Sequence, residues 1–422
     1  MNEVRKISLL LLMLILPYTY AFSESPFSLS GYFKNFSIVL KPSDIEGLLG
    51  SKSPAMGMVK DRLRLNMFYD ISDRCSINLA YDISPRIQDQ ALFDQDFFMM
   101  QVDPFSYRCR DLDSRLYPGK GEEVRSFAVF QNLDRAFLAV KLDLADIYIG
   151  RQAIAWGSAR TINPTDIIAP FTYEELDTED RIGVDALRFR IPMGFMGEID
   201  LGYVAGEDFK NDRSALFVRD KFYAAKTDVS LILMRFQENV LAGIDFTRAI
   251  GGAGFWWESA YVMSDACHNF DLKNSDNYFR TTVGMDCNFS GSTYGFLEYH
   301  YSNTGSGRPK NYLSMFEKSA VSQGSVYLMG RHYLIPGLTC QISPLVMFTG
   351  QALVNLEDRS SFIAPQIEYN IAENIYLSGG LMVSIGEKPA YRVTSGLIPG
   401  LSLNSEFGSY PDMYFMAFRV YF

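Results

Sequence analysis

Residues 62–83 read RLRLNMFYDISDRCSINLAYDI, and two alternating runs in this stretch decide the fold. Apolar side chains recur at every second position, which is the period of a β-strand with one apolar face. The two runs are joined by only Ser72-Asp73-Arg74, so they form a hairpin. The apolar positions are Leu63, Leu65, Met67, Tyr69 and Ile71 in the first run, and Cys75, Ile77, Leu79, Tyr81 and Ile83 in the second.

The same alternation continues from Phe27 to the last residue, without a helical stretch or a second domain. Connections alternate between tight turns and long loops, as in outer-membrane barrels with short periplasmic turns and long extracellular loops. We therefore predict an all-β, transmembrane antiparallel β-barrel of about eighteen strands, with sixteen as the alternative because the region 206–240 is ambiguous. The predicted strands are 27–41, 60–71, 75–84, 133–142, 145–152, 183–191, 195–205, 216–226, 228–236, 239–249, 253–263, 277–289, 292–302, 325–335, 338–356, 361–371, 374–386 and 411–422.

The C-terminal strand supports a barrel. Tyr414, Met416, Phe418 and Val420 occupy alternate positions of a run that ends on Phe422. Such an ending resembles the signal by which outer-membrane barrels are recognised for assembly, and it implies the barrel assembly machinery as a partner. Closure is also required physically, since lipid cannot satisfy the backbone groups of an open sheet edge.

The N-terminal residues predict a secretory signal peptide at 1–21, followed by the barrel at 22–422. Arg5 and Lys6 precede an apolar run that Pro17 ends, and this run is too short to span a bilayer. We expect cleavage after Ala21, with Ser23 nearly as suitable. Because no later run is long enough for a transmembrane helix, we expect a bacterial outer-membrane location.

Composition limits the partners and cofactors. The net charge of −10 argues against nucleic acid, which requires a concentrated basic surface. Among the five cysteines, Cys109 and Cys267 fall in predicted loops, where a disulfide is one open alternative. The spacing of His and Cys suggests no metal site, and we expect no cofactor. The partners expected are outer-membrane lipid and lipopolysaccharide and small solutes, and the sequence leaves the oligomeric state open.

On this register the inner face of the barrel carries charges of both signs. A lumen lined in this way can sort solutes by charge, whereas the alternative is that the charges pair and brace the wall. The candidate lumen cations are Arg62, Arg64, Arg135, Arg188, Arg190, Arg280 and Arg419, and the candidate anions are Asp70, Asp82, Glu198, Asp200, Asp245, Glu258 and Asp286.

The segment 150–171, GRQAIAWGSARTINPTDIIAPF, carries the clearest motif. Gly150-Arg151-Gln152 ends a strand, and Trp156-Gly157 and Asn163-Pro164-Thr165-Asp166 follow. This pattern resembles a porin-like family of outer-membrane barrels, over about 20 residues. The resemblance implies an outer-membrane channel or substrate-specific porin, without identifying the solute.

The loop 153–182 is too apolar for a free extracellular tip. We expect it to fold into the lumen and narrow the pore, with Arg151, Arg160 and Asp166 near the constriction; a cap on the barrel rim is the alternative. The acidic run that follows could bind divalent cations, although a solvated loop is the simpler expectation. This run comprises Glu174, Glu175, Asp177, Glu179 and Asp180.

Two other functions remain open. His300-Tyr301-Ser302-Asn303 resembles the His-x-Ser-Asn element of outer-membrane lipid hydrolases, which would make Ser302 the nucleophile and His300 its base. The long loop 84–132, with apolar residues such as Phe97 and Met99, could instead serve an adhesin or assembly scaffold. We expect a porin-like, non-enzymatic channel for small polar or charged solutes.

Overall fold

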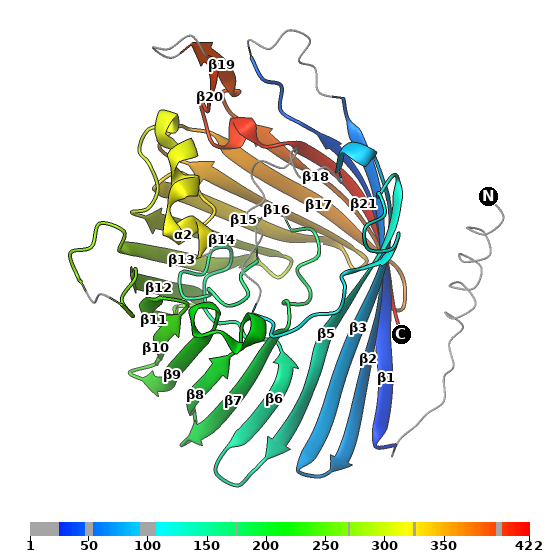
Figure 1. The fold of residues 1–422 in the computed structure, drawn as a ribbon, viewed down its shortest axis with the longest axis vertical. Coiled ribbons are helices and arrows are strands. Elements are labelled where there is room, and N and C mark those ends of the chain that lie inside the picture. The colour runs from blue at the N-terminus through cyan, green and yellow to red at the C-terminus, as the bar shows by residue number, and fades with distance from the viewer. Residues whose placement is uncertain are drawn as a thin grey trace, which may run out of the picture.

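The computed structural model describes residues 25–46, 54–92, 107–171, 173, 175–268, 271–323, 326–393 and 399–422. Within these ranges eighteen antiparallel strands form one closed ring (Figure 1). The predicted signal peptide at 1–21 and the middle of the loop 84–132 lie outside the described residues. The strands are β1 (Phe27–Lys41), β2 (Met56–Ser72), β3 (Cys75–Gln88), β5 (Phe127–Lys141), β6 (Asp146–Gln152), β7 (Val184–Met193), β8 (Gly197–Val204), β9 (Ala215–Ala224), β10 (Thr227–Phe236), β11 (Asn239–Ile250), β12 (Ala253–Met263), β13 (Tyr278–Ser290), β14 (Thr293–Ser302), β15 (His332–Ser343), β16 (Val346–Asn355), β17 (Ser361–Ala372), β18 (Ile375–Ile385) and β21 (Asp412–Tyr421).

The barrel closes between the first and last strands. Tyr32 on β1 pairs with Arg64 of β2 on one side and with Tyr421 of β21 on the other. β21 in turn pairs with β18. Every strand of the ring therefore has a neighbour on each side, which removes the open edges of the sheet.

Short strands and helices lie outside the ring of eighteen strands. β4 (Arg115–Tyr117) pairs with β5, and β19 (Ala390–Val393) and β20 (Pro399–Ser402) form a separate hairpin. The described helices are η1 (Gln90–Leu92), η3 (Glu207–Phe209), η4 (Asn211–Arg213), η5 (Pro309–Asn311), η6 (Leu313–Glu317), α2 (Ser319–Ser322) and η7 (Phe407–Ser409). None of the described helices is long and apolar enough to cross a membrane.

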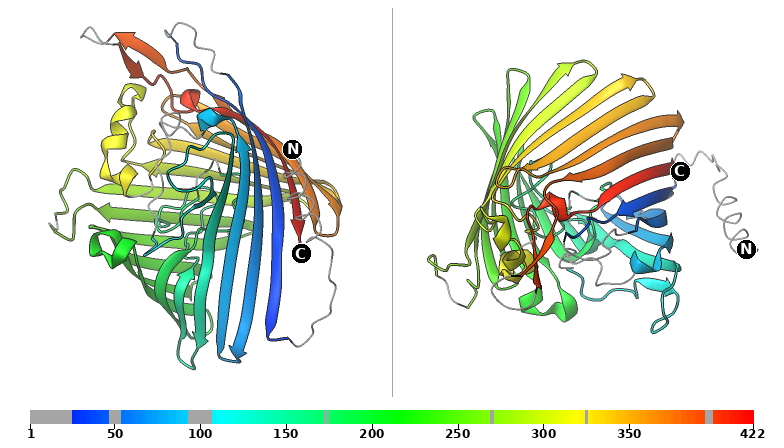
Figure 2. Two further views of the ribbon diagram at one scale, coloured as in Figure 1. Left: turned by 45° about the vertical axis from the view of Figure 1, so that its right-hand side comes forward. Right: turned by 90° about the horizontal axis from the view of Figure 1, so that it is seen from above.

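The two ends of the barrel differ, as the sequence predicts. At one end, here called the turn end, short connections such as Asp73-Arg74 and Gly251-Gly252 join the strands. The opposite end, called the loop end, carries the connections 153–183 and 303–331 (Figure 2). β9 and β10 are separate strands joined by a tight turn, so the prediction of eighteen strands is confirmed and the alternative of sixteen is not.

One predicted connection is wrong. The sequence predicts strands at 325–335 and 338–356 with a turn at 336–337, because Pro-Gly is a strong turn signal. Instead β15 runs through Pro336 and Gly337, and the turn lies at Pro344-Leu345. The ladder between β15 and β16 is interrupted at residues 335–336, which accommodates a proline that has no backbone N–H to donate. The loop that begins at residue 303 therefore extends to residue 331.

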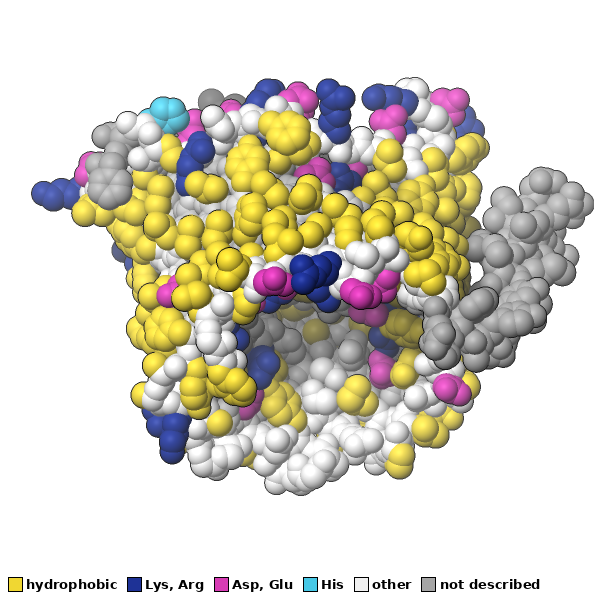
Figure 3. Space-filling view, turned by 90° about the horizontal axis from the view of Figure 1, so that it is seen from below, with side chains coloured by type: hydrophobic (Ala, Val, Ile, Leu, Met, Phe, Trp, Pro, Cys, Tyr) yellow, Lys and Arg dark blue, Asp and Glu magenta, His cyan; other side chains and the backbone are white. Residues whose placement is uncertain are grey.

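Inward and outward side chains alternate along each strand. On β12 the outward Phe255 and Trp257 are 41% and 39% exposed, whereas the inward Trp256 and Glu258 are 2% and 0% exposed. Figure 3 shows the outer surface as a broad band of hydrophobic side chains, beside a hollow in which polar and charged side chains gather. The apolar face of the alternating pattern is thus on the outside, as a barrel in lipid requires.

The described cysteines are all unpaired. Cys109 and Cys267 therefore form no disulfide with each other, which closes the alternative that the sequence left open. The sulfur of Cys267 instead accepts a hydrogen bond from Arg235 at 3.4 Å.

Candidate functional site

The loop between β6 and β7, residues 153–183, lies inside the barrel (Figure 2). Its apolar side chains Ile154, Trp156, Ile167 and Ile168 are buried, and they pack with inward residues of the wall such as Phe217. The Trp156 and Phe217 rings meet edge to face with centroids 4.6 Å apart. Burial of these side chains removes them from water and explains why so apolar a loop does not extend into solvent.

Two carboxylates of the barrel wall hold the first half of this loop. Glu258 on β12 accepts hydrogen bonds from the backbone N–H groups of Ser158, Ala159 and Thr165, at 2.8–3.2 Å. The side chains of Thr165 and Asn163 also donate to Glu258, at 2.7 and 3.1 Å.

Glu298 on β14, two strands after β12, also binds backbone N–H groups of the loop. It accepts hydrogen bonds from the backbone N–H groups of Arg160 and Thr161 at 2.5 and 3.1 Å, and from the indole N–H of Trp256 at 2.8 Å. Hydrogen bonds to a carboxylate are about twice as strong as neutral ones. The path of the loop is therefore fixed by the wall rather than by the loop alone.

The acidic run holds the second half of the loop against the opposite wall. Asp177 accepts from Lys34 of β1 at 2.6 Å and from Arg62 of β2 at 2.7 Å, and Asp180 lies 3.6 Å from Arg64. Burial opposes the ionisation of Asp177, but Lys34 and Arg62 outweigh it and hold the pKa of this carboxyl below its usual range. The expectation of a solvated acidic loop is therefore wrong, because the cations of the wall lie within reach.

Most of the inner-face charges that the sequence identifies are paired. Arg188 contacts Asp200 at 2.6 Å and Arg190 contacts Glu198 at 2.5 Å, both across the β7–β8 pair. The other pairs between strands, or between the loop and the wall, are Arg64–Asp82, Arg62–Asp82, Arg160–Asp286 and Arg419–Glu368, and Arg135 pairs with its chain neighbour Asp134 on β5. This pairing is the bracing arrangement that the sequence left as the alternative to free pore charges.

Arg151 lies at the end of β6 and is bound on several sides. Its guanidinium pairs with Asp185 of β7 at 2.8 Å and with Asp111 at 2.8 Å, and it donates to the backbone oxygens of Leu133 and Arg110. These contacts fix the segment around residues 107–111 to the wall. Arg151 does not belong to the cavity lining described next.

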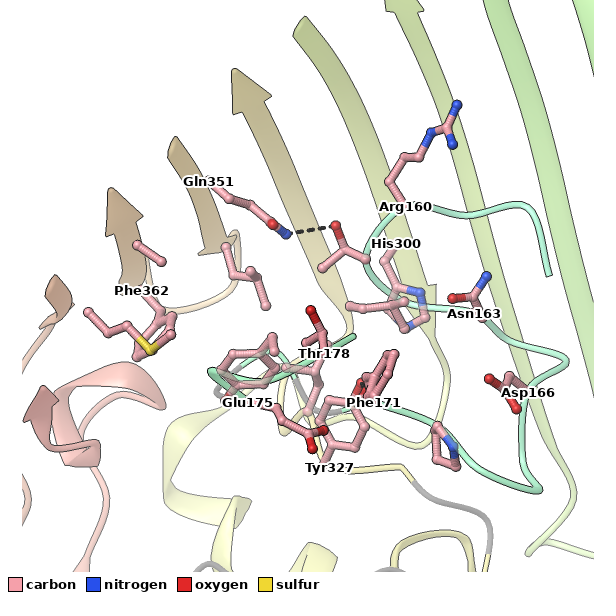
Figure 4. A pocket seen from close by; sticks show the side chains of 18 of the residues that line it. Arg160, Asn163, Asp166, Phe171, Glu175, Thr178, His300, Tyr327, Gln351 and Phe362 are labelled. Carbon is pink, nitrogen blue, oxygen red and sulfur yellow. Dashed lines mark hydrogen bonds between the residues drawn. The ribbon is translucent and has the colours of Figure 1, made fainter. Parts of the chain in front are cut away.

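A cavity of 480 Å³ remains between the loop and the wall formed by β13–β18. Arg160, Asp166 and Arg280 line it, together with His300 and Ser302. Figure 4 shows Phe362 and Tyr327 on one side of this space and Asn163 and Asp166 on the other. We call it the loop-side cavity; its volume is within the range of about 300–1,000 Å³ typical of small-molecule sites.

Asp166 is the most buried acid of this lining, at 1% exposure. Burial raises the pKa of Asp166 to about 6, although Arg181, 3.0 Å away, acts in the opposite direction. Arg181 also lies over the Phe171 ring at 3.8 Å. Asp166 and Arg181 thus form one ion pair within the loop.

His300 and Ser302 face the loop-side cavity from β14. The Nδ1 of His300 shares a hydrogen bond with the Thr282 hydroxyl at 2.9 Å, and the Ser302 hydroxyl shares one with Thr304 at 2.5 Å. Both side chains are almost fully buried inside the barrel. Their inward orientation leaves them beneath the loop and away from the outer surface, where a lipid substrate would lie.

A second cavity of 410 Å³ lies nearer the turn end and is called the turn-side cavity. Thr339 and Gln341 of β15, Asn370 of β17 and Tyr376 of β18 contribute to its lining. Tyr294 also lines it and donates to Asp286 at 2.8 Å, the carboxylate that Arg160 contacts at 3.0 Å. The Arg160–Asp286–Tyr294 group therefore stands between the two cavities.

Several lining residues were missed by the sequence reasoning. Gln351 and Gln366 are uncharged, whereas the pore-lining residues that the sequence predicts are all charged. Glu298, which binds the loop and does not line the cavity, is not among the candidates that the sequence predicts. Tyr173, Tyr327 and Phe362 come from segments far apart in the chain, so their association is visible only in the folded structure.

No protein-family model matches this sequence, and no curated protein matches it. Solved structures do resemble it. OccAB4 of Acinetobacter baumannii has a TM-score of 0.53 at 9% identity, covering 96% of this chain and 100% of its own. The outer membrane protein OprD of Pseudomonas aeruginosa has a TM-score of 0.51 at 6% identity, with 94% of each chain covered. A BenF-like porin of Pseudomonas fluorescens Pf-5 has a TM-score of 0.54 at 8% identity, covering 94% of this chain and 98% of its own. At these identities the likeness shows a shared barrel fold.

Proposed function

We propose that this chain is a bacterial outer-membrane channel through which small polar solutes diffuse, without catalysis. One observation carries the proposal: the loop 153–183 lies inside a closed barrel and leaves a 480 Å³ cavity against one wall. A structural cap would fill the lumen, whereas a folded-in loop beside an open cavity narrows a pore and makes it selective.

Three further features support this proposal. The outer surface carries a band of hydrophobic side chains, while charged and polar side chains gather inside (Figure 3), as a membrane barrel requires. One of the structures with the same fold is described as a porin and another as an outer membrane protein. The N-terminal signal at 1–21 would export the chain, and the strand that ends on Phe422 would serve recognition by the barrel assembly machinery in a membrane of lipid and lipopolysaccharide.

The site residues divide into two roles in this proposal. Arg160, Asp166 and Arg280 line the constriction, while His300 and Ser302 contribute polar groups to the same wall. The remaining charges position the loop and the wall through ion pairs. These bracing residues are Arg62, Arg64, Arg151, Arg188, Arg190, Glu198 and Asp200.

Thiol labelling tests the path directly. In a variant in which all five cysteines are replaced by serine, Thr349→Cys would place a thiol in the loop-side cavity. A charged, water-soluble thiol reagent should then lower the conductance of the refolded channel. Phe348→Cys, on the outer face of the same strand, is the matched control and should leave the conductance unchanged. Equal responses from both variants would contradict the proposed path.

A further inference from the structure

The two cavities lie one after the other along a single wall of the barrel. On β17 the inward residues follow one another toward the turn end: Phe362, Ala364 and Gln366 line the loop-side cavity, and Glu368 and Asn370 line the turn-side cavity. β14 repeats this order, with His300 in the first lining and Tyr294 in the second. A solute that crosses the barrel therefore has the wall β13–β18 beside it throughout.

The neighbouring wall, β1–β3, is separated from β18 by β21 alone and is tied to the loop by ion pairs. Lys34, Arg62 and Arg64 are all engaged with the acidic run. Their charges are neutralised in place, and Lys34 and Arg64 are 1% and 2% exposed. These three cations therefore bind the loop and are not free to attract a solute.

Formal charges also cancel along the open route. The loop-side cavity is lined by three arginines, which are Arg160, Arg181 and Arg280. Three acids balance their charge: Asp166 and Glu175 of the same lining, and Asp286, which pairs with Arg160. In the turn-side cavity the charged lining residue is Glu368, which pairs with Arg419. A route with balanced charge gives no general advantage to anions or cations.

The remaining lining has the chemistry of a site for hydroxylated rings. Tyr173 meets the rings of Tyr327 and Phe362 with centroids 5.7 and 5.3 Å away, which creates an aromatic surface on one side of the cavity. Facing groups are amides and hydroxyls, namely Asn163, Gln366 and Thr349. Aromatic rings offer a large apolar face, and a few placed polar groups fix the orientation of a ligand.

Arg280 of the same lining holds the loop against the wall. Its Nη2 group donates to the backbone oxygen of Pro164 at 2.8 Å, while its Nε–H is buried and has no hydrogen-bond acceptor among the described residues.

We propose that the preferred solute of this route is a neutral polyhydroxylated ring, of the size of a mono- or disaccharide. This inference rests on the proposed channel function and names its substrate class. The aromatic surface would contact the C–H face of the ring, and the amides and hydroxyls of the lining would bond its hydroxyl groups.

Single-channel current of the refolded full chain tests the inference with maltose, glucuronate and glucosamine as neutral, anionic and cationic probes. Maltose should interrupt the current at lower concentration than either charged probe. Phe362→Ala and Tyr327→Leu should weaken the block by maltose about three- to tenfold, since an aromatic contact of this kind supplies about that much affinity. Tyr369→Ala removes an outward tyrosine from the same strand as Phe362 and should leave the block unchanged.

The outcomes separate the inference from the function on which it rests. A conducting channel that glucuronate or glucosamine blocks better than maltose would overturn the neutral-solute inference and leave the channel function intact. A folded barrel without conductance would overturn the channel function itself. If Phe362→Ala fails to fold, Gln366→Leu removes a hydrogen-bonding group of the same cavity. It should also weaken the block by maltose, and an unchanged block in this variant would overturn the inference.

Discussion

The carboxylate of Glu258 lies 2.7 Å from the place where a Cβ atom on Gly157 would stand. Asn163 Nδ2 lies 2.3 Å from the same point, and the backbone at Gly157 has a φ of +105°. Only glycine fits here, because a side chain would collide with the acid that binds the loop and would also be strained. The Trp-Gly pair in the loop motif thus has a physical cause: it lets the backbone approach Glu258 closely.

Replacing Gly157 by alanine should displace the loop from the wall and increase the single-channel conductance, with more frequent current fluctuations. Gly121→Ala is the matched control, since Gly121 also has a positive φ but would meet nothing within 4 Å. Bilayer recordings of both variants check this prediction. Wild-type conductance in Gly157→Ala would show that the loop does not limit the current.

Glu258→Gln tests the same attachment from the wall. The glutamine keeps one acceptor oxygen but turns an NH₂ group toward loop donors, and each buried donor left unsatisfied costs about 1–3 kcal/mol. We expect faster hydrogen exchange of the backbone amides at 158–165 and noisier currents. Glu198→Gln, at the partly exposed Arg190 pair, should have neither effect. Unaltered exchange at 158–165 in Glu258→Gln would refute this role.

Arg160→Ala should make the channel more cation-selective. The Arg160 side chain is half exposed and neutralises Asp286 between the two cavities, so its removal leaves a negative charge beside the route. Reversal potentials in a salt gradient measure the change. Arg190→Ala, which removes a cation from the β7–β8 wall, is the control, and an equal shift in both variants would argue against a route past Arg160.

The pairing of Asp177 with Lys34 and Arg62 should keep the loop docked in acid. The pKa of Asp177 is depressed in the folded chain, so its stabilising contribution is complete above its ordinary pKa of about 4 and is lost only as the pH falls through the lower folded value. The protection of the backbone amides at residues 176–180 against hydrogen exchange should therefore be the same at pH 7 and pH 5. Asp177→Asn should show at pH 7 the loss of protection that the wild type shows only in strong acid, and wild-type protection in this variant would contradict the prediction.

Glu406 should give the loop end the opposite pH dependence. It is fully buried and accepts hydrogen bonds from Met329, Tyr333 and Asn355, at 2.5–2.8 Å. Burial raises its pKa to about 7, above the value of about 4.3 expected when unfolded. The folded chain therefore binds the proton more tightly, and the packing of these loops should weaken as the pH rises from about 4 to about 7.

Hydrogen exchange at Met329 and Phe407, compared at pH 5 and pH 8, measures this change. The exchange rates at pH 8 should rise by more than the intrinsic increase of amide exchange with pH. Glu406→Gln should remove this extra increase because glutamine does not ionise. Acceleration of the same size in the variant would assign the pH dependence to another group.

The sequence predicts the barrel well because strand alternation is local: each strand shows its own period of two. Residues 27–41 and 253–263 are predicted to the residue. The error at Pro336-Gly337 arises because proline in a strand is tolerated only where the ladder is interrupted, and that interruption depends on the neighbouring strand.

The site is less predictable because its contacts join residues that are far apart in the sequence. The apolar residues of the loop at 153–182 indicate that it must be buried. Its partners Glu258 and Glu298, however, are about 100 residues away or more in the sequence. The pairing of Asp177 with Lys34 depends on barrel closure, which brings the first strand next to the last. A list of inner-face charges therefore identifies the groups but not which of them are free.

The most direct test of the central claim is the single-channel current of the refolded wild-type chain in a planar lipid bilayer. A channel that runs along the β13–β18 wall predicts discrete, stable openings with little preference between cations and anions. A barrel that is correctly folded and inserted but carries no current would contradict it, because the loop would then close the lumen instead of narrowing it.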